Sequence, residues 1–294
     1  MQCPTPLYLR DKVTAKWSKV PCGKCEICLD NKRQDWFVRL LEEMKASVLS
    51  LFVTLTYDEE FVPIKNGIRV LNEDDVTSFF MKLRKRFQYD KKDIKFKYYL
   101  ASEYGSLGQR PHYHTCFFFK FDFIDAENYI YTRHYIEDAI RDKWGKGFVD
   151  IGLLRPGGIA YTTKYIHKKR TPPEGAVKPF QRQSQGLGEA YVQNFNNINY
   201  HKRNVIDNNK YTYHQTTYRL PRYFREKLFN ETELRTLRRE YEKRAEQISD
   251  QEWQEINAHL EKWRTRKRSE QNQITAKKFK IRKSLKMSSG EIDN

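Results

Sequence analysis

The sequence has no long hydrophobic run and no apolar block close to its first residue. No stretch approaches the roughly 18 consecutive apolar residues that a membrane-spanning helix needs, and the mean hydropathy of -0.87 is too polar for a membrane protein. Residues 1–19 lack the apolar core of a secretory signal. We therefore expect a cytosolic protein that has no membrane partner.

Two further shortages narrow the classes of function. No glycine-rich loop with the lysine of a nucleotide-binding P-loop occurs, so we expect no helicase activity in this chain. Cysteine accounts for only 5 of the 294 residues, and a cytosolic setting argues against disulfides.

Basic and aromatic residues, in contrast, are plentiful. Lys and Arg number 55 against 38 Asp and Glu, which gives a formal net charge of +17, and there are 19 Tyr and 18 Phe. A disordered basic chain would not carry so many aromatic side chains, so we expect a folded domain with appendages. The positive charge favours a polyanionic partner, most often nucleic acid, because Lys and Arg release condensed counterions when they neutralise phosphates.

Much of the excess charge is concentrated near the end of the sequence. Between residues 264 and 286, ten Lys and Arg stand against one Glu. Such a segment is typical either of a nonspecific nucleic-acid clamp or of a solvated tail, and both interpretations stay open.

The hydrophobic pattern predicts alternating strands and helices. Expected helices cover residues 30–50, 72–89, 125–144 and 158–169, and expected strands cover residues 51–58, 95–103, 112–120 and 147–153. From residue 51 the order is β-α-β-β-α-β, which is the ferredoxin-like split βαβ order, followed by one more helix. We therefore predict an α+β fold with a central antiparallel sheet.

The predicted sheet domain covers residues 51–169, and three further parts surround it. Residues 1–50 are expected to form a Cys-bearing segment, irregular to about residue 29, followed by a helix. Residues 170–230 are rich in Pro, Gly, Asn and Gln, and we expect mostly extended loop there. Residues 231–294 are expected to form a basic helical tail.

Two histidines alternate along the third predicted strand. Side chains two residues apart on a strand share a face, so His112 and His114 project together. Glu103 closes the preceding strand and would lie beside them in an antiparallel hairpin. Two imidazoles and a carboxylate suit a divalent ion such as Mg²⁺ or Mn²⁺ used as a Lewis acid, although Zn²⁺ would bind as well. The alternative is two surface histidines that alternate by chance.

The helix predicted at residues 158–169 carries two tyrosines one turn apart. Tyr161 and Tyr165 share a face, with Lys164 alongside. A tyrosine acts as a covalent nucleophile once its phenol is deprotonated or its target is polarised. A nearby lysine would stabilise the charge of the phenolate or of the phosphorane. The alternative is that both tyrosines pack a half-buried amphipathic helix.

Four of the five cysteines lie near the beginning of the sequence. Cys22, Cys25 and Cys28 are each separated by two residues, and Cys3 could supply a fourth thiolate to a structural Zn²⁺. Three close thiols would also suit an Fe–S cluster, and reduced cysteines in a compact segment are the third interpretation. Cys116 shares the face of the two histidines, but we expect it to pack in the core.

Taken together, these motifs resemble the HUH endonucleases, in which two histidines flank a hydrophobic residue. More closely, the chain resembles the rolling-circle replication initiators of microviruses, the small single-stranded DNA bacteriophages, in their gokushovirus-like branch. FVTLTYD (52–58) is similar to the family's first motif, RPHYH (110–114) to its second and YTTKYIHK (161–168) to its third. VPCGKCEICL (20–29) and LPRYFREKLF (220–229) also resemble that branch.

The resemblance implies roles for the matching residues. His112 and His114, with Glu103, would hold the metal against the scissile phosphate. Tyr161 or Tyr165 would attack the phosphate and leave a 5′-phosphotyrosine and a free 3′-OH, and the second tyrosine would cleave the regenerated origin. Lys164 would help to stabilise the charge. The family's third metal ligand varies, and the alternatives to Glu103 lie at the end of the first strand: Asp58, Glu59 and Glu60.

The implied function is site-specific nicking and rejoining of single-stranded DNA at a replication origin, which starts and ends phage rolling-circle replication. The implied partners are single-stranded or unwound phage origin DNA and the host helicase and DNA polymerase, in the host bacterial cytoplasm. Three rivals stay open: an HUH transposase or relaxase, a metal-dependent hydrolase that leaves no protein–DNA adduct, and a non-enzymatic nucleic-acid-binding protein.

Overall fold

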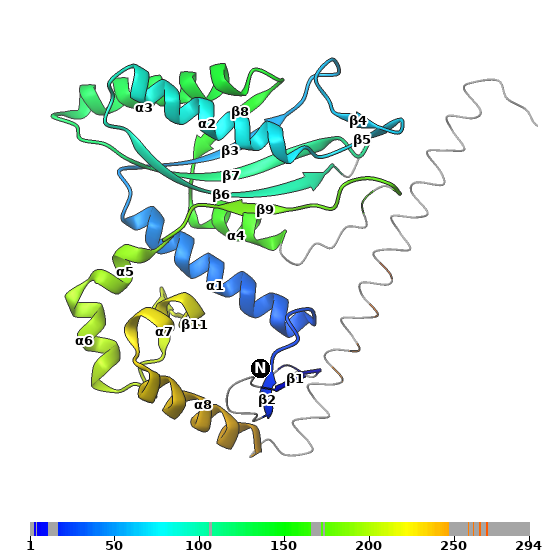
Figure 1. The fold of residues 1–294 in the computed structure, drawn as a ribbon. Coiled ribbons are helices and arrows are strands. Elements are labelled where there is room, and N and C mark those ends of the chain that lie inside the picture. The colour runs from blue at the N-terminus through cyan, green and yellow to red at the C-terminus, as the bar shows by residue number, and fades with distance from the viewer. Residues whose placement is uncertain are drawn as a thin grey trace, which may run out of the picture. The chain divides into compact units, whose positions relative to one another are not determined.

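Figure 1 shows the fold in the computed structural model of the chain, which describes residues 3, 5–10, 17–105, 108–165, 172, 174–246, 258, 261, 265 and 269. The chain separates into two compact units, Met1–Leu237 and Arg238–Asn294. The finer division into four parts stays a prediction. The basic segment at 264–286 lies outside the described residues, apart from Thr265 and Ser269.

A five-stranded antiparallel sheet is the centre of the first unit. Its strands, from one edge to the other, are β8 (Val149–Leu153), β3 (Leu49–Thr56), β7 (Pro111–Lys120), β6 (Lys95–Tyr104) and β9 (Gln181–Gln183). In the first four strands, β7 lies between β3 and β6 and β8 takes the outer edge, as a split βαβ unit requires. The predicted α+β fold with ferredoxin-like order is confirmed, and β9 extends it.

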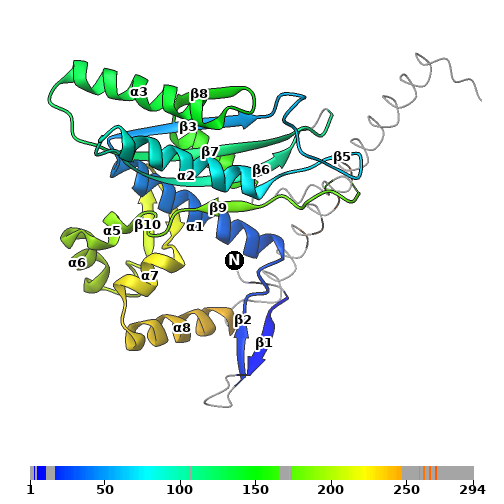
Figure 2. The same ribbon diagram turned by 45° about the horizontal axis from the view of Figure 1, so that its top comes forward.

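Alternation along β3 sorts the two faces of the sheet. Leu51, Val53 and Leu55 are fully buried in a core with α2 (Glu73–Tyr89) and α3 (Ala126–Trp144). The residues between them face the opposite side, where α1 (Glu26–Lys45) and α4 (Pro156–Lys164) lie. Figures 1 and 2 show these two helical layers with the sheet between them.

Capping residues define the ends of the two helices on the first face. The Asn72 side chain accepts hydrogen bonds from the backbone N–H groups of Asp74 and Asp75 at the start of α2. Asp125 caps α3 in the same way, and Gly145 ends α3 in the left-handed conformation. The helices predicted at 72–89 and 125–144 are confirmed to within one residue.

The beginning of the chain differs from the expectation in two ways. The stretch expected to be irregular contains a hairpin of β1 (Leu7–Arg10) and β2 (Trp17–Val20), and α1 begins at Glu26. The helix expected to reach residue 50 ends at Lys45, because Leu49 already alternates into the core as the first residue of β3.

The expectation of mostly extended chain over residues 170–230 is wrong. Besides β9, this segment forms five short elements: α5 (Glu189–Gln193), α6 (Phe195–Arg203), β10 (Lys210–Tyr213), β11 (Thr216–Arg219) and α7 (Arg222–Leu228). Widely spaced apolar side chains fold it, since Leu187, Tyr211 and Phe224 share a core with α1 and with the sheet. The polar average composition conceals them.

The remaining elements are peripheral to the sheet. They are the small hairpin of β4 (Ile64–Lys65) with β5 (Ile68–Arg69), and α8 (Glu231–Glu246). The last helix predicted before residue 170 spans Pro156–Lys164, and residues 166–169 lie outside the described part of the chain. No helix within the described ranges has the length and apolarity needed to cross a membrane.

Candidate metal and tyrosine site

The two histidines and Glu103 meet on the α4 face of the sheet, where the β6–β7 hairpin begins. Glu103 is the direct neighbour of His112 across the two strands, and direct neighbours on antiparallel strands share a face. His114 lies two residues further along β7 and therefore on that face. The structure thus brings together the three residues that strand parity groups.

The distances suit three ligands of one ion. The Nε2 atoms of His112 and His114 lie 3.4 and 3.7 Å from Oε2 of Glu103, and one ligand atom from each residue lies within 4.8 Å of the others. Ligands held about 2.1 Å from a common ion are separated by about 3.0–3.4 Å. Closing on a metal would therefore need only small side-chain movements.

Hydrogen bonds orient both imidazole rings from behind. Nδ1 of His112 lies 3.1 Å from the carbonyl oxygen of Arg110, and Nδ1 of His114 lies 3.2 Å from Oγ1 of Thr54. A carbonyl oxygen only accepts, so Nδ1 of His112 carries the proton and the lone pair of Nε2 faces Glu103. Metal-binding histidines are held by such partners in general.

Burial makes this grouping costly unless its charge is compensated. Glu103 and His114 are each only 6% exposed. An ionised carboxylate in such a place is expensive unless it is paired or coordinates a metal. The chemistry of the donor set, two imidazoles and one carboxylate oxygen, therefore fits a divalent ion.

Helix α4 places both tyrosines against the histidine pair. The ring of Tyr165 stacks on His114 at 5.2 Å, and the ring of Tyr161 meets His114 edge-on at 5.3 Å. Tyr161 is 45% exposed, whereas Tyr165 is 9% exposed. Lys164 is exposed at the last position of α4.

The environment of Tyr165 keeps its phenol neutral. Burial raises the pKa of Tyr165 well above its usual value, and hydrogen bonds with Tyr161 and Glu103 and the negative charge of Glu103 raise it further. The proton therefore stays on this hydroxyl at ordinary pH. The two tyrosines thus share a helix face but not an environment.

The acids at the end of the first strand are placed differently. Glu59 is exposed and forms ion pairs with Arg69 and Arg110 at 2.9 and 2.8 Å. Within the described part of the chain, the carboxylate that groups with the two histidines is that of Glu103, and not those of Asp58, Glu59 or Glu60.

Sequence analysis assigned no role to two residues of β3 that support the site. The ring of Phe52 stacks on His114 at 5.7 Å, with the planes 13° apart, and Thr54 holds Nδ1 of His114 as described. Both have the parity of the site face, since Thr54 pairs directly with His114 across β3 and β7. That register was the signal that could have identified them.

A second group of potential ligands lies apart from the first. Cys3, Cys22, Cys25 and Cys28 each offer a sulfur, and the four sulfurs lie within 4.8 Å of one another. Cys116 is different, because it is fully buried and its Sγ lies 3.4 Å from Oγ1 of Thr162 in α4. It packs in the core, as expected.

The fold and the site define the class. A split βαβ sheet carries two histidines and a glutamate on one face, and a tyrosine-bearing helix lies against them, which is the arrangement of the HUH fold that the motifs indicate. Residues 50–170 match the model of the phage replication-associated protein ORF2 family. The matched segment contains the histidine pair, Glu103 and both tyrosines of α4.

Three phage proteins are similar to the chain. It is 34% identical over 188 residues to replication-associated protein ORF2 of Spiroplasma virus 4, covering 58% of this chain and 56% of that protein. The values are 24% over 223 residues for replication-associated protein ORF4 of Chlamydia phage 1, covering 71% and 53%. For replication-associated protein VP4 of Bdellovibrio phage phiMH2K they are 29% over 157 residues, covering 51% and 48%.

These matches confirm the resemblance to phage replication proteins, and the chain spans about half the length of each of them. Among solved structures, the N-terminal nuclease domain of the non-structural protein-1 of minute virus of mice matches 55% of this chain and 82% of that one. The identity is 12% and the TM-score 0.21, so this likeness carries no argument.

Proposed function

We propose that the chain nicks and rejoins single-stranded DNA at a phage replication origin through a 5′-phosphotyrosine intermediate. The observation that carries the proposal is the contact of Tyr161 and Tyr165 with His114, which belongs to the histidine–glutamate group. A nucleophile and a cation site that share one scissile phosphate need this proximity. The match of residues 50–170 to a replication-associated family supports the same activity.

The proposed cofactor is Mg²⁺ or Mn²⁺, held by His112, His114 and Glu103. When bound, such an ion polarises the scissile phosphate as a Lewis acid. The protein's own part is to fix the ligands, through the Arg110 carbonyl and Thr54, and to exclude water through the buried face of α4.

The chemistry is a transesterification that conserves bonds. The Oη of a tyrosine forms a bond to phosphorus while the bond from phosphorus to the 3′ oxygen breaks. The phenol loses its proton, and the leaving oxygen gains one to become a free 3′-OH for a host polymerase. Attack by a 3′-OH on the phosphotyrosine reverses the step, so rejoining needs no ATP because the phosphoester bond is retained.

Tyr161 makes the first cleavage in this proposal. Its side chain is nearly half exposed, and a DNA strand can reach it, whereas Tyr165 is buried and hydrogen-bonded to Glu103. Tyr165 would act in the second cleavage, after the first tyrosine is occupied. Lys164, next to Tyr165 in sequence and exposed, would stabilise charge on the phosphorane.

The proposed substrate is single-stranded or unwound origin DNA in the host bacterial cytoplasm. The basic composition of the chain supports binding to phosphates, and a stretched single strand fits beside a half-exposed tyrosine more readily than a duplex does. A host helicase would unwind the origin, and a host polymerase would extend the 3′-OH.

The test is a cleavage assay on labelled single-stranded oligonucleotides that tile the genome encoding the chain. With Mn²⁺ or Mg²⁺, we expect a labelled band that survives boiling and migrates with the protein, and that disappears in the double variant Tyr161→Phe/Tyr165→Phe and in His112→Ala. The matched control Tyr89→Phe changes a tyrosine that is 87% exposed on α2 and should keep the band. DNA binding without any adduct on any oligonucleotide would contradict the proposal.

A further inference from the structure

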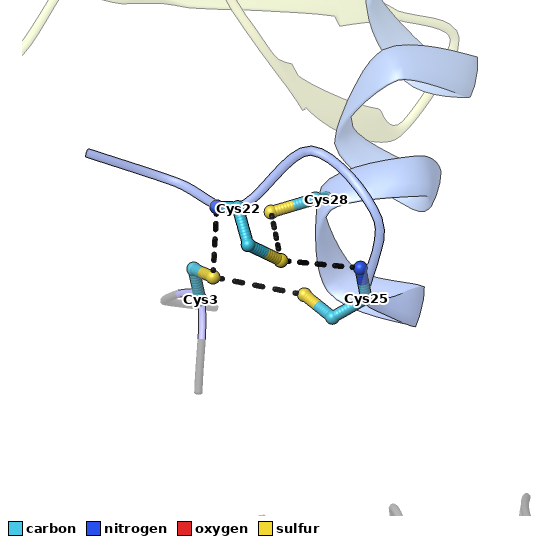
Figure 3. A group of neighbouring side chains, drawn as sticks. All are labelled: Cys3, Cys22, Cys25 and Cys28. Carbon is cyan, nitrogen blue, oxygen red and sulfur yellow. Dashed lines mark hydrogen bonds between the residues drawn. The ribbon is translucent and has the colours of Figure 1, made fainter. Parts of the chain in front are cut away.

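Three separate pieces of the chain bring four cysteines together at its N-terminal end (Figure 3). Cys3 precedes β1, Cys22 and Cys25 lie in the turn between β2 and α1, and Cys28 lies in the first turn of α1. The β1–β2 hairpin, in which Leu7 pairs with Val20, folds the first piece back onto the others.

The sulfur atoms have the spacing of ligands around a single tetrahedral ion. The Sγ atoms of Cys3 and Cys25 are 3.7 Å apart, and those of Cys22 and Cys28 are 4.0 Å apart. Four thiolates at about 2.3 Å from a central Zn²⁺ lie about 3.8 Å from one another. We propose that these four cysteines bind one structural Zn²⁺, independently of the nicking site.

The same spacing disfavours an iron–sulfur cluster. In a cubane cluster each thiolate binds a different iron atom, so the cluster itself holds the four cysteine sulfurs apart. A two-iron cluster holds them as two separated pairs. Here all four sulfurs lie within 4.8 Å of one another, around one point. The group therefore has room for one ion and not for a cluster.

Backbone N–H groups already point at the sulfurs. The N–H groups of Lys24 and Cys25 lie 3.4 and 3.3 Å from Sγ of Cys22, and the N–H of Cys22 lies 3.3 Å from Sγ of Cys3. Such bonds offset the negative charge of zinc-bound thiolates. The turn that aims them needs Gly23, whose φ of +70° a side chain rarely adopts.

The site would tie the N-terminal hairpin to the start of α1. Further along, α1 buries Val38 and Leu41 in the same core as Ile159 of α4, the helix that carries the tyrosines. Binding replaces four thiol protons by one Zn²⁺ without any redox change, and the binding free energy adds to the folding free energy of this region. The role proposed for the ion is therefore structural.

Metal analysis of the purified full-length chain tests the proposal. The background is His112→Ala/His114→Ala, so that zinc at the nicking site does not contribute. We expect one tightly held Zn²⁺ per chain, released in step with thiol modification by an organomercurial. Cys22→Ser/Cys25→Ser should lose the zinc, whereas Cys116→Ala, which alters the core cysteine, should keep it.

A second measurement covers the case in which the cysteine variant does not fold. Co²⁺ added to the intact chain after removal of zinc should give intense tetrahedral bands and a sulfur-to-cobalt charge-transfer band, typical of four thiolates. Iron with acid-labile sulfide, disulfides in the freshly isolated chain, or zinc that persists in Cys22→Ser/Cys25→Ser would each overturn the proposal. Because the histidine variant is used throughout, loss of nicking activity does not affect the outcome.

Discussion

At the scale of single residues, the site separates two tyrosines that the sequence alone presents as equivalent. Helical spacing puts Tyr161 and Tyr165 on one face, but only the three-dimensional packing buries Tyr165 against His114 and Glu103 while Tyr161 stays half exposed. Burial and the nearby carboxylate hold the pKa of Tyr165 high, so its neutral phenol is the poorer nucleophile in this state.

Single substitutions of the two tyrosines should therefore differ in effect. Tyr161→Phe should reduce the rate of first cleavage by about 1,000-fold or more, because it removes the nucleophile, and Tyr165→Phe by less than about 10-fold. Both changes delete one hydroxyl, so each serves as the control for the other in single-turnover assays. Equal losses in the two variants, or a larger loss in Tyr165→Phe, would count against the proposed order.

Glu103 should contribute to metal affinity in a way that Glu59 does not. Glu103→Gln removes a charged oxygen from the histidine group and should weaken Mn²⁺ binding by about 100-fold or more. Glu59→Gln alters an exposed carboxylate paired with Arg69 and Arg110 and should leave the affinity unchanged. Calorimetric titration of both variants decides which acid is the third ligand, and the reverse pattern would assign Glu59.

At the scale of elements, the sequence predicts what depends on local pattern. Alternation in β3, β6 and β7 and the caps Asn72 and Asp125 were sufficient to predict the strands, the helices α2 and α3 and the grouping of Glu103 with the histidines. The end of α1 was not predictable, because residues 46–50 are compatible with a helix and only pairing in the sheet makes Leu49 a strand residue.

A buried hydroxyl network joins β7 to the start of α2. The Oη atoms of Tyr57 and Tyr113 are 2.9 Å apart, and the backbone N–H of Asn72 donates to Tyr113 at 2.9 Å. Burial raises the pKa of Tyr113 to about 12 and also raises that of Tyr57. The residue between the two site histidines thus serves the opposite face of the strand.

These raised pKa values predict loss of stability at alkaline pH. Unfolded tyrosine ionises near pH 10, whereas folded Tyr113 keeps its proton to higher pH, so its contribution is complete below about pH 10 and falls as the pH rises toward about 12. Urea unfolding between about pH 8 and about pH 11 should show this fall. Tyr113→Phe should make it shallower, and an unchanged slope in that variant would contradict the assignment.

At the scale of the whole first unit, the segment after residue 170 completes the fold. It adds β9 to the sheet edge and packs Leu187, Tyr211 and Phe224 against α1. Sequence analysis missed this because each apolar residue meets a partner far away in the chain, and no local periodicity records such contacts. Its composition alone resembles loop.

Glu43 of α1 is the polar counterpart of that packing. It is almost completely buried, and its Oε2 accepts hydrogen bonds from the backbone N–H of Gly188 at 2.7 Å and from Nζ of Lys97 at 3.3 Å. Glu43→Ala should lower the free energy of unfolding by about 2–3 kcal/mol, because it leaves both donors without this acceptor. Chemical denaturation measures this, with Glu60→Ala on the surface as the control. Equal stability of the two variants would show that Glu43 does not fasten the segment.

The central claim is that a tyrosine of α4 becomes covalently joined to the 5′ end of the cut strand. The most direct measurement is mass spectrometry of the boiled cleavage reaction after digestion with nuclease and protease. The account predicts a nucleotide attached to the peptide that contains Tyr161 and Tyr165, on Tyr161 after a single turnover. Cut DNA that accumulates with free 5′-phosphates, with no nucleotide on either tyrosine, would contradict the account and indicate a metal-dependent hydrolase.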